Sequence, residues 1–583
     1  MKSLFTNKNL NIAAYTLIVI HFLFMFGFFH PAISSMDSSG YFKQAQLIAE
    51  EGTTKLKKES PLQYKAAHWL VLNESEFISH YPPGFPFILA IFHKIGGAYL
   101  ALLSIVLMCS LSLLGVYLIT QKITNLAWAL LAVLLLGINP VFNNYALNQD
   151  SHMATTFLLV WGSYFILQWY LTKKNIYAFV GAFFLAGIVG TRYAEVIFII
   201  PFAVAVFVAF ITKKIKWITL ITFAAGAALP ILAMAIYHKV VFDSIIATPY
   251  SITGESSSFS LEYFKNNWWL YIKSLLVEGL GIVLITGIAG LFAMFKQNRN
   301  IFYISLGLIL PITILYMAYY FAPRMSMAIL RFLVPIFPVF VISSVYLFKW
   351  GYEKWQRPAI AIILTIVIAN AAWAIPGNNE SLTRQRNSNG ILTVISDSIC
   401  QYIPEGSIII ASDPIQKQLD YLGHWNLIDE TLIVGQQQRR RDRRQQPGGL
   451  MPPAPGGGGF GNAMAGQAMR AAKMEQLEYY QKHGDEEISQ VFIDDLLSWQ
   501  QELIKEQGNA KIYWVGAEKV VDYGVPLSDS LRWESDITIP KKYAKRMKDK
   551  GNEHRVNPGG GMPGMKSVIP TDDIMVIKEW VVQ

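Results

Sequence analysis

Charged residues are scarce in this chain of 583 residues. Lys, Arg, Asp and Glu together make up 15% of it, against about 25% in an ordinary soluble domain, whereas hydrophobic residues make up 53%. The shortage is concentrated in the first two thirds, where one apolar run follows another. This pattern excludes a soluble globular protein for that part of the chain.

Several functional signatures are also missing. The two cysteines, Cys109 and Cys400, lie far apart in sequence and in expected environment, so neither a disulfide nor a cysteine metal site is predicted. The sequence contains no glycine-rich nucleotide-binding loop and no nucleic-acid-binding motif, although its net charge is +9. We expect that charge to face membrane headgroups, and we expect no nucleic-acid partner.

What the sequence does contain is a series of apolar runs that suit membrane crossing, for which a helix needs about 20 apolar residues. The first run exceeds the apolar region of a signal peptide and is predicted to be retained as a span. The short fifth and sixth runs could instead form one broken segment. The eleven candidates are 10–30, 98–120, 126–142, 151–171, 177–191, 194–211, 217–238, 274–295, 300–321, 331–349 and 358–376.

The charges between the runs predict the orientation. Lys and Arg are concentrated in the linkers after even-numbered runs, whereas the linker 143–150 has none. Since cationic loops remain in the cytoplasm, the N-terminus is predicted to be cytoplasmic. Residues 31–97, 239–273 and 377–583 are then predicted to lie outside. We expect an integral protein of a bacterial inner membrane, because the chain lacks eukaryotic retention signals.

The first outside loop has two notable segments. Asp37 precedes an amphipathic stretch, and we expect a helix capped by Ser38 or Ser39 that runs to Glu51 along the membrane surface. Further on, the segment 80–86 reads His-Tyr-Pro-Pro-Gly-Phe-Pro. Its prolines predict an interruption of regular helix and a rigid return of the chain into the membrane.

The C-terminal part is predicted to be a small α/β domain over 377–583, outside a transmembrane domain over 1–376. An arginine run followed by Pro, Gly, Met and Gln fills 436–468, a composition that cannot bury a core, so a flexible insertion is predicted there. Strands are expected at 407–411, 511–515 and 573–582, and helices at 413–422 and 488–506.

Ionisable side chains stand at the outer ends of several predicted spans, where charge is costly and often functional. Two carboxylates and several arginines at one face would hold an anion beside a base. Taken singly, each has a simpler explanation as a helix cap, a solvated loop residue, an interface anchor or a hydrogen-bonded structural histidine. The residues are Asp37, Asp150 with His152, Arg192, and Arg331 with Arg324 just before it.

The order of these motifs resembles the glycosyltransferase C superfamily. An aspartate opens an amphipathic helix in a long first outside loop, and the segment 80–86 is similar to the motif of the protein-mannosyltransferase and aminoarabinose-transferase branches. The resemblance covers residues 1–376 and implies an α-helical polytopic membrane protein of about eleven transmembrane helices. It also rests on Asn139-Pro140 with Gln149-Asp150, on Gly190-Thr191-Arg192, and on the run from Arg331 to Pro338.

The resemblance implies an activity. It is the transfer of a sugar from a polyprenyl-phosphate donor to an acceptor hydroxyl on the outer face, with inversion at the anomeric carbon. No cofactor is required, and the sugar and the acceptor (lipid, glycan or protein) stay open. On this reading Asp37 and Asp150 are catalytic, Arg192, Arg331 and Arg324 hold the departing phosphate, and His80 and Tyr81 contact substrate.

The sequence departs from the family pattern at two places. Some branches pair two acids in the first loop, where only Asp37 stands here, and the aminoarabinose branch has an acid and a lysine where this chain has His80 and Tyr81. If a divalent cation binds, Asp37, Asp150 and His80 or His152 are the candidate ligands.

Two other functions remain open. A lipid or sugar transporter, or a flippase, would carry charges at mid-span and two repeated halves, whereas no convincing repeat is found here and the charges cluster at one face. A non-catalytic scaffold with an outside binding domain would not require Asp37, Arg192 and Arg331 to converge. Convergence of these side chains is therefore the observation that separates the three functions.

Overall fold

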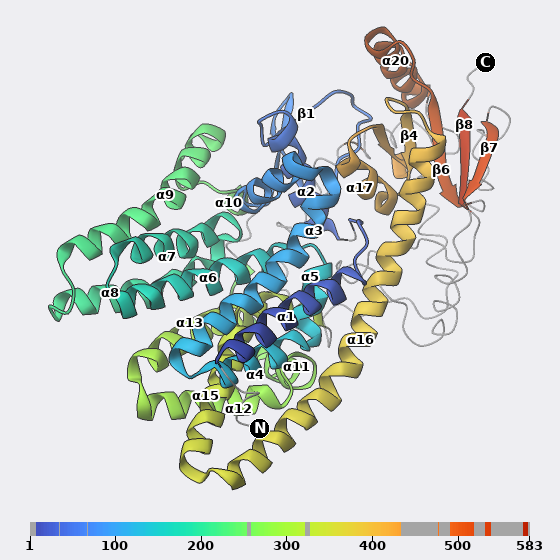
Figure 1. The fold of residues 1–583 in the computed structure, drawn as a ribbon. Coiled ribbons are helices and arrows are strands. Elements are labelled where there is room, and N and C mark those ends of the chain that lie inside the picture. The colour runs from blue at the N-terminus through green and yellow to red at the C-terminus, as the bar shows by residue number, and fades with distance from the viewer. Residues whose placement is uncertain are drawn as a thin grey trace.

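The computed structural model describes residues 7–33, 35–66, 68–252, 258–320, 327–432, 476, 490–517, 531–537 and 575–580. Arg324 and the insertion 436–468 lie outside these residues, so the predictions made for them stay predictions. Within the described part, a helical bundle carries a group of smaller elements at one end, which includes two sheets (Figure 1).

The bundle begins with α1 (Asn7–Phe26), α3 (Gly84–Ile123), α4 (Leu126–Gly137), α5 (Pro140–Leu147), α6 (Ser151–Thr172) and α7 (Asn175–Gly187). After the 3-10 helices η1 (Ile188–Gly190) and η2 (Tyr193–Ile199) come α8 (Ile200–Ile211), α9 (Trp217–Phe242) and the short α10 (Pro249–Ile252). The second half holds α11 (Leu261–Ser274), a π-helical turn η4 (Leu275–Gly279), α12 (Ile282–Gln297), α13 (Arg299–Met317), α14 (Met327–Leu330), η5 (Arg331–Ile336), α15 (Phe337–Trp355) and α16 (Arg357–Tyr402).

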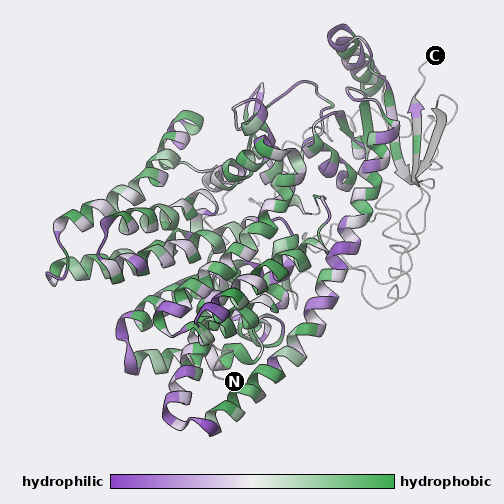
Figure 2. Cartoon of the chain, viewed as in Figure 1, coloured by the Kyte–Doolittle hydropathy of each residue, from purple (hydrophilic) through white to green (hydrophobic). Residues whose placement is uncertain are grey.

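The described helices agree with the predicted apolar runs. Among the described residues, seven helices are long and apolar enough to cross a membrane, and the number rises to as many as nine if each of the bent pairs α4–α5 (62°) and α11–α12 (110°) counts as one span. The other two predicted runs are α6, which carries several Ser, Thr and His residues, and the short α7. Every predicted run thus contains helix, while the number that cross stays a prediction. Hydrophobic residues dominate the bundle helices in Figure 2.

Close packing joins neighbouring helices of the bundle. α12 meets α15 at Gly290, where a β-carbon would overlap the backbone of Ser343, and α9 meets α7 at Gly226, where a β-carbon would overlap the backbone of Phe179. In an apolar solvent, such small residues let helices gain dispersion contacts that larger side chains would prevent.

The return of the chain into the bundle differs from the prediction. The prolines of segment 80–86 were expected to exclude regular helix, but α3 begins at Gly84 and carries Pro86 in its first turn. A proline is tolerated there because the N–H that it lacks would have no helical partner. The helix kinks further on at Gly96 and Gly97, short of the predicted run at 98–120.

The first loop forms α2 (Met36–Glu50) and an antiparallel sheet of β1 (Lys55–Lys57), β3 (Glu76–Ser79) and β2 (Trp69–Asn73), in that spatial order. The expected cap at Ser38 or Ser39 was wrong: Ser35 caps α2, and its Oγ accepts a hydrogen bond from the backbone N–H of Ser38. Most of α2 is buried, because other parts of the chain cover the helix that was expected to lie along the membrane surface.

The C-terminal part is an α/β unit joined to the bundle by α16, which is 46 residues long and continues well beyond its predicted run (Figure 1). The five expected elements are present, and β5 and β7 were not predicted. The sheet has the order β5-β4-β6-β8-β7, with β5, β4 and β6 parallel and the last two pairings antiparallel. The elements are β4 (Ile408–Ala411), α17 (Asp413–Leu422), β5 (Asn426–Asp429), η6 (Glu430–Leu432), α20 (Gln490–Gln507), β6 (Ile512–Ala517), β7 (Leu531–Ile537) and β8 (Met575–Trp580).

The first loop and the C-terminal unit share a hydrophobic core. Leu47, Tyr64 and Trp69 from the first loop belong to the same buried cluster as Ile409 and Leu419 from the C-terminal unit. Burial of apolar surface between these segments therefore holds them together, although they are more than 300 residues apart in sequence. The division into domains at residue 376 stays a prediction.

Candidate active site

The Asp37 carboxylate is held by two side chains from distant parts of the chain. Its Oδ2 accepts a hydrogen bond from Nη1 of Arg331 at 3.1 Å, and its Oδ1 accepts one from the hydroxyl of Tyr81 at 2.6 Å. Asp37 lies in the first turn of α2, Tyr81 just before α3, and Arg331 at the start of η5. The Asp37 and Arg331 side chains are 22% and 16% exposed, so neither is fully enclosed by the protein.

The two arginines expected to hold a phosphate share one aromatic ring. The Cζ atoms of Arg192 and Arg331 lie 5.2 Å and 4.7 Å from the ring centroid of Phe332. Guanidinium groups bind aromatic faces by cation–π attraction, so Phe332 fixes both cations in one place. The structure thus brings Arg192 and Arg331 together beside Asp37.

Arg192 is paired with a carboxylate that the sequence analysis missed. Its Nε lies 2.6 Å from Oε1 of Glu195, and the hydroxyl of Tyr316 donates to the same oxygen at 2.9 Å. Glu195 is fully buried, and within the described residues its Oε2 has no hydrogen-bond partner. The available signal was a carboxylate at the start of an apolar run, three residues after an arginine.

Asp150 was expected to be a second catalytic acid, but its contacts are of another kind. Its Oδ1 accepts hydrogen bonds from Oγ of Ser35 at 3.0 Å and of Ser38 at 3.3 Å, and its Oδ2 accepts one from Nδ2 of Asn148 at 2.6 Å. Ser35 caps α2, so Asp150 ties the start of α6 to the start of α2. Asp150 is only 1% exposed, which leaves little surface for a substrate.

Their surroundings shift the pKa values of the two acids, Asp37 and Asp150, in opposite directions. Burial opposes the charge of Asp37, but the Arg331 guanidinium, the Tyr81 hydroxyl and Arg192 outweigh it and lower the pKa of Asp37. Burial and the negative charge of Asp37 raise the pKa of Asp150 to about 7. The three hydrogen-bond donors around Asp150 favour its charged form. The two hydroxyls can rotate and the Asn148 amide can turn over to accept a hydrogen bond from the protonated acid instead, so burial and the repulsion from Asp37 decide the direction of the pKa shift.

Tyr81 and His80 occupy different surroundings. The Tyr81 ring packs 4.5 Å from the ring of Tyr41 and lies so close to Gly40 that a β-carbon there would overlap it. His80 instead packs with its ring 4.6 Å from the ring of Tyr250, in the short helix α10. Tyr81 therefore holds the Asp37 carboxylate, and the predicted contact of either residue with substrate stays a prediction.

The candidate metal ligands do not form a metal site in the part of the chain that the structure describes. No group of three or more His, Cys, Asp or Glu side chains is placed to hold an ion there. The oxygens of Asp37 are occupied by Arg331 and Tyr81, and His152 packs edge-on against Phe332 at 5.5 Å. The optional divalent cation therefore lacks a set of ligands among these residues.

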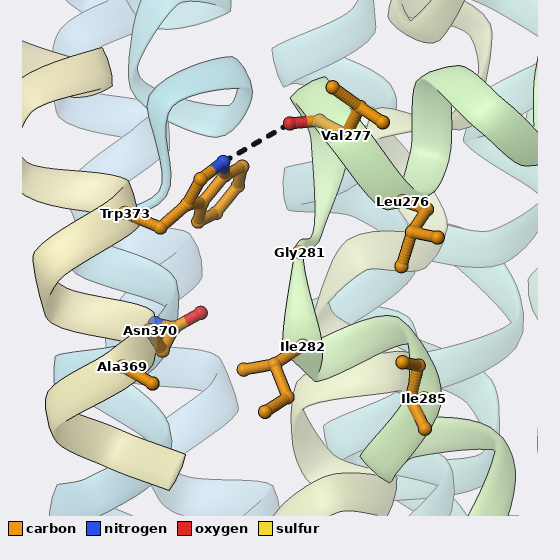
Figure 3. A pocket seen from close by; sticks show the side chains of 8 residues that line it. All are labelled: Leu276, Val277, Gly281, Ile282, Ile285, Ala369, Asn370 and Trp373. Carbon is orange, nitrogen blue, oxygen red and sulfur yellow. Dashed lines mark hydrogen bonds between the residues drawn. The ribbon is translucent and has the colours of Figure 1, made fainter. Parts of the chain in front are cut away.

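An apolar groove of about 390 Å³ opens between α16 and the break that joins η4 to α12 (Figure 3). Trp373 spans it, and its indole Nε1 donates to the backbone oxygen of Val277 at 3.1 Å. The lining is Leu276, Val277, Gly281, Ile282, Ile285, Ala369, Asn370 and Trp373, and contains none of the predicted site residues. The mostly apolar lining of this groove suits a hydrocarbon chain rather than a charged substrate.

Comparisons with known proteins agree with this architecture. The sequence profile of the dolichyl-phosphate-mannose-protein mannosyltransferase family matches residues 80–238. No curated protein sequence matches the chain significantly. The structure resembles that of ArnT from Cupriavidus metallidurans bound to undecaprenyl phosphate, with a TM-score of 0.50 and 11% identity over 91% of this chain and 97% of ArnT.

A second similar structure is the oligosaccharyltransferase of Archaeoglobus fulgidus tethered to an acceptor peptide, with a TM-score of 0.48 and 14% identity over 88% of this chain and 70% of that protein. The fold shared with ArnT confirms the predicted class, a polytopic helical membrane protein with a small α/β unit. The profile match over residues 80–238 and the fold shared with ArnT agree with the resemblance to the glycosyltransferase C superfamily that the order of the motifs indicated.

Proposed function

We propose that this protein is an inverting membrane glycosyltransferase that moves a sugar from a polyprenyl-phosphate donor to an acceptor hydroxyl. The observation that carries the proposal is the partly exposed Asp37 side chain, whose carboxylate is bonded to Arg331 and lies close to Arg192. A base and two cations at one site match the two needs of the reaction, which are a deprotonated acceptor and a stabilised leaving phosphate. The ArnT structure binds undecaprenyl phosphate, a carrier of the proposed class.

In the proposed reaction, the acceptor hydroxyl gives its proton to Asp37 while its oxygen forms a bond to the anomeric carbon. The bond between that carbon and the phosphate oxygen breaks, and its electron pair stays on the phosphate. Attack opposite the leaving group inverts the anomeric configuration. The lowered pKa of Asp37 keeps its carboxylate ionised at neutral pH, as a proton acceptor must be, although the pairing with Arg331 also makes it a weaker base.

The ion pair between Asp37 and Arg331 couples the two halves of this reaction. Before transfer, the donor phosphodiester carries one negative charge and Arg331 is bound to the Asp37 carboxylate. When Asp37 takes the proton it loses its charge, and the phosphate gains its second charge in the same step. Arg331 can then exchange the neutral acid for the phosphate, for which its planar donor fork is suited.

We assign the second phosphate contact to Arg192. The buried Glu195 and Tyr316 fix the guanidinium of Arg192, and Phe332 holds its plane beside that of Arg331. Because Glu195 is buried, its role is to orient Arg192 rather than to meet substrate. Arg324 stays a predicted third contact.

The surroundings of Asp150 lead to a positioning role. A protonated aspartic acid and an asparagine are alike in shape and charge, so we expect Asp150→Asn to keep transfer within about 10-fold of the unmodified protein at pH 6. Asp150→Ala removes the acceptor for Ser35 and Ser38 and should lose more. Initial rates of sugar transfer across a pH series measure both.

Asp150 also predicts a dependence of stability on pH. Its pKa rises from 3.8 in the unfolded chain to about 7, so the folded protein binds the extra proton between these values. The stabilisation is therefore full at low pH and is lost as the pH rises to about 7. Thermal unfolding should show that Asp150→Asn raises the midpoint more at pH 8 than at pH 5; equal shifts would contradict a raised pKa.

The other two functions are less well supported. In the described residues, the ionisable groups Asp37, Arg192 and Arg331 meet at one site rather than along a path through the bundle, which disfavours a transporter. A scaffold gives no reason to keep two arginines and two carboxylates together at a cost in desolvation. We place the site on the outer face of a bacterial inner membrane, with the C-terminal unit in the periplasm, from the distribution of cationic loops.

Binding of undecaprenyl phosphate tests the proposed function. Purified protein in nanodiscs should be stabilised against thermal unfolding by about 2.7 kcal/mol at a lipid concentration about 100 times the Kd. Undecaprenol carries the same chain without charge, and inorganic phosphate carries the charge without the chain, so neither should match it. Equal stabilisation by undecaprenol, or no stabilisation by undecaprenyl phosphate, would contradict the proposal.

A further inference from the structure

Helix α17 of the C-terminal unit is anchored on its own sheet. The side-chain amide of Gln416 donates to the backbone oxygens of Ile409 at 3.2 Å, Ala411 at 3.3 Å and Ile428 at 2.5 Å. Ile409 and Ala411 belong to β4 and Ile428 to β5, so one buried side chain fixes α17 to two strands. The helix cannot shift relative to that sheet without breaking these bonds.

The opposite side of α17 holds the segment that leads into α2. The side-chain Oε1 of Gln418 accepts from the backbone N–H of Ile33 at 2.6 Å, and its Nε2 donates to the backbone oxygen of Pro31 at 3.2 Å. Gln418 is 4% exposed, so these bonds are shielded from water and costly to lose. Ile33 lies four residues before Asp37.

Further contacts hold the body of α2 against α17. Nζ of Lys43 donates to the backbone oxygen of Asp420 at 3.0 Å and lies 3.4 Å from its carboxylate. The ring of Tyr421 packs edge-on against Phe42 with centroids 5.0 Å apart. At the end of α17, Gly423 has a φ of +76°, and a β-carbon there would overlap the side chain of Gln46. The helix that bears Asp37 is thus held at its start and along its length.

We propose that α17 is a positioning element for the active site, and that Gln418 is a positioning residue for Asp37. The inference deepens the proposed function and rests on it for its catalytic consequence. Asp37 keeps its ionised form through short contacts to Arg331 and Tyr81, which belong to other parts of the chain. A displacement of α2 by about 1 Å would lengthen both contacts, and errors of that size reduce turnover strongly. The C-terminal unit therefore acts in catalysis without touching substrate.

The test compares Gln418→Ala with Glu405→Ala in the full-length protein. Glu405 lies in the same unit, and its side chain is 76% exposed. In Gln418→Ala, we expect faster hydrogen exchange at the Ile33 amide and in the first turn of α2. We also expect sugar transfer in membranes of the expressing cells to fall by about 10- to 100-fold.

The pH profile of Gln418→Ala separates positioning from general damage. Loss of the Arg331 and Tyr81 contacts removes the effects that lower the pKa of Asp37, so the acid limb of the rate profile should move to higher pH. Asp420→Asn removes the carboxylate charge beside Lys43 but keeps the backbone contact with Lys43. It should speed hydrogen exchange in α2 and shift the acid limb in the same direction as Gln418→Ala, by a smaller amount. It serves as the second variant if Gln418→Ala does not fold.

Three outcomes distinguish the two proposals. Faster exchange at Ile33 and a shifted acid limb, with Glu405→Ala unchanged, would support the role of Gln418. Exchange and pH profile equal to those of Glu405→Ala, in a protein that transfers sugar, would overturn that role and leave the proposed function standing. Faster exchange at Ile33 in Gln418→Ala, when neither the unmodified protein nor Glu405→Ala transfers sugar, would overturn the proposed function and, with it, the catalytic role of α17.

Discussion

Replacement of Asp37 by asparagine is expected to lower sugar transfer by about 1000-fold or more while leaving the protein folded and inserted. The amide of asparagine has nearly the same size but cannot accept the proton of the acceptor hydroxyl, and general-base catalysis contributes about 100- to 10000-fold. Transfer of a labelled sugar in membranes measures the loss, and immunodetection of the membrane fraction measures insertion.

Two matched variants control this experiment. Asp243→Asn removes a carboxylate whose side chain is 94% exposed, and Asp150→Asn removes the neighbouring buried acid. Asp243→Asn should retain full activity, and Asp150→Asn should stay within about 10-fold of the unmodified protein at pH 6. Transfer at the unmodified rate in Asp37→Asn would eliminate Asp37 as the base, and equal losses in Asp37→Asn and Asp150→Asn would show that the two acids act as one unit.

Replacement of Arg331 by alanine is expected to have the second largest effect. The variant loses the cation that receives the second charge of the leaving phosphate, which by analogy with other charge-stabilising groups costs about 100- to 1000-fold in turnover. It also leaves Asp37 partly buried without its strongest counter-charge, so the pKa of Asp37 should rise. The acid limb of the rate profile should therefore move to higher pH.

Arg384→Ala is the matched control, because Arg384 lies on α16 with a side chain that is 58% exposed. Arg331→Lys is the second variant if alanine impairs folding. Lysine keeps the charge but loses the planar fork and the stacking on Phe332, so transfer should fall short of the unmodified rate. A full rate in Arg331→Ala, with an unshifted profile, would remove Arg331 from the site.

Much of the bundle could be predicted from local sequence. A run of about 20 apolar residues is favoured as helix in a bilayer because every backbone polar group must be satisfied within the segment. Outside the bundle, the β-branched run at 407–411 and the Asp413-Pro414 pair located a strand and a helix start within a residue or two. Asp37, Arg192 and Arg331 could be chosen as site residues because charge beside an apolar run is rare.

The sequence could not predict which side chains these residues contact. The pairing of Asp37 with Arg331 joins residues 294 apart, and it depends on how α2 and η5 pack rather than on any local pattern. Glu195 was missed because its importance comes from its distance to Arg192. The burial of α2 was missed because α17, which covers it together with α3, follows more than 360 residues later.

The most direct test of the proposed function is mass spectrometry of glycolipids and glycans from cells that lack the gene, complemented with either the unmodified protein or Asp37→Asn. We predict that deletion removes a defined sugar from a lipid, glycan or protein, that the unmodified protein restores it, and that Asp37→Asn, present at an equal level, does not. Restoration of the sugar by Asp37→Asn, or an unchanged set of glycoconjugates after deletion, would contradict the assignment of this site to glycosyl transfer.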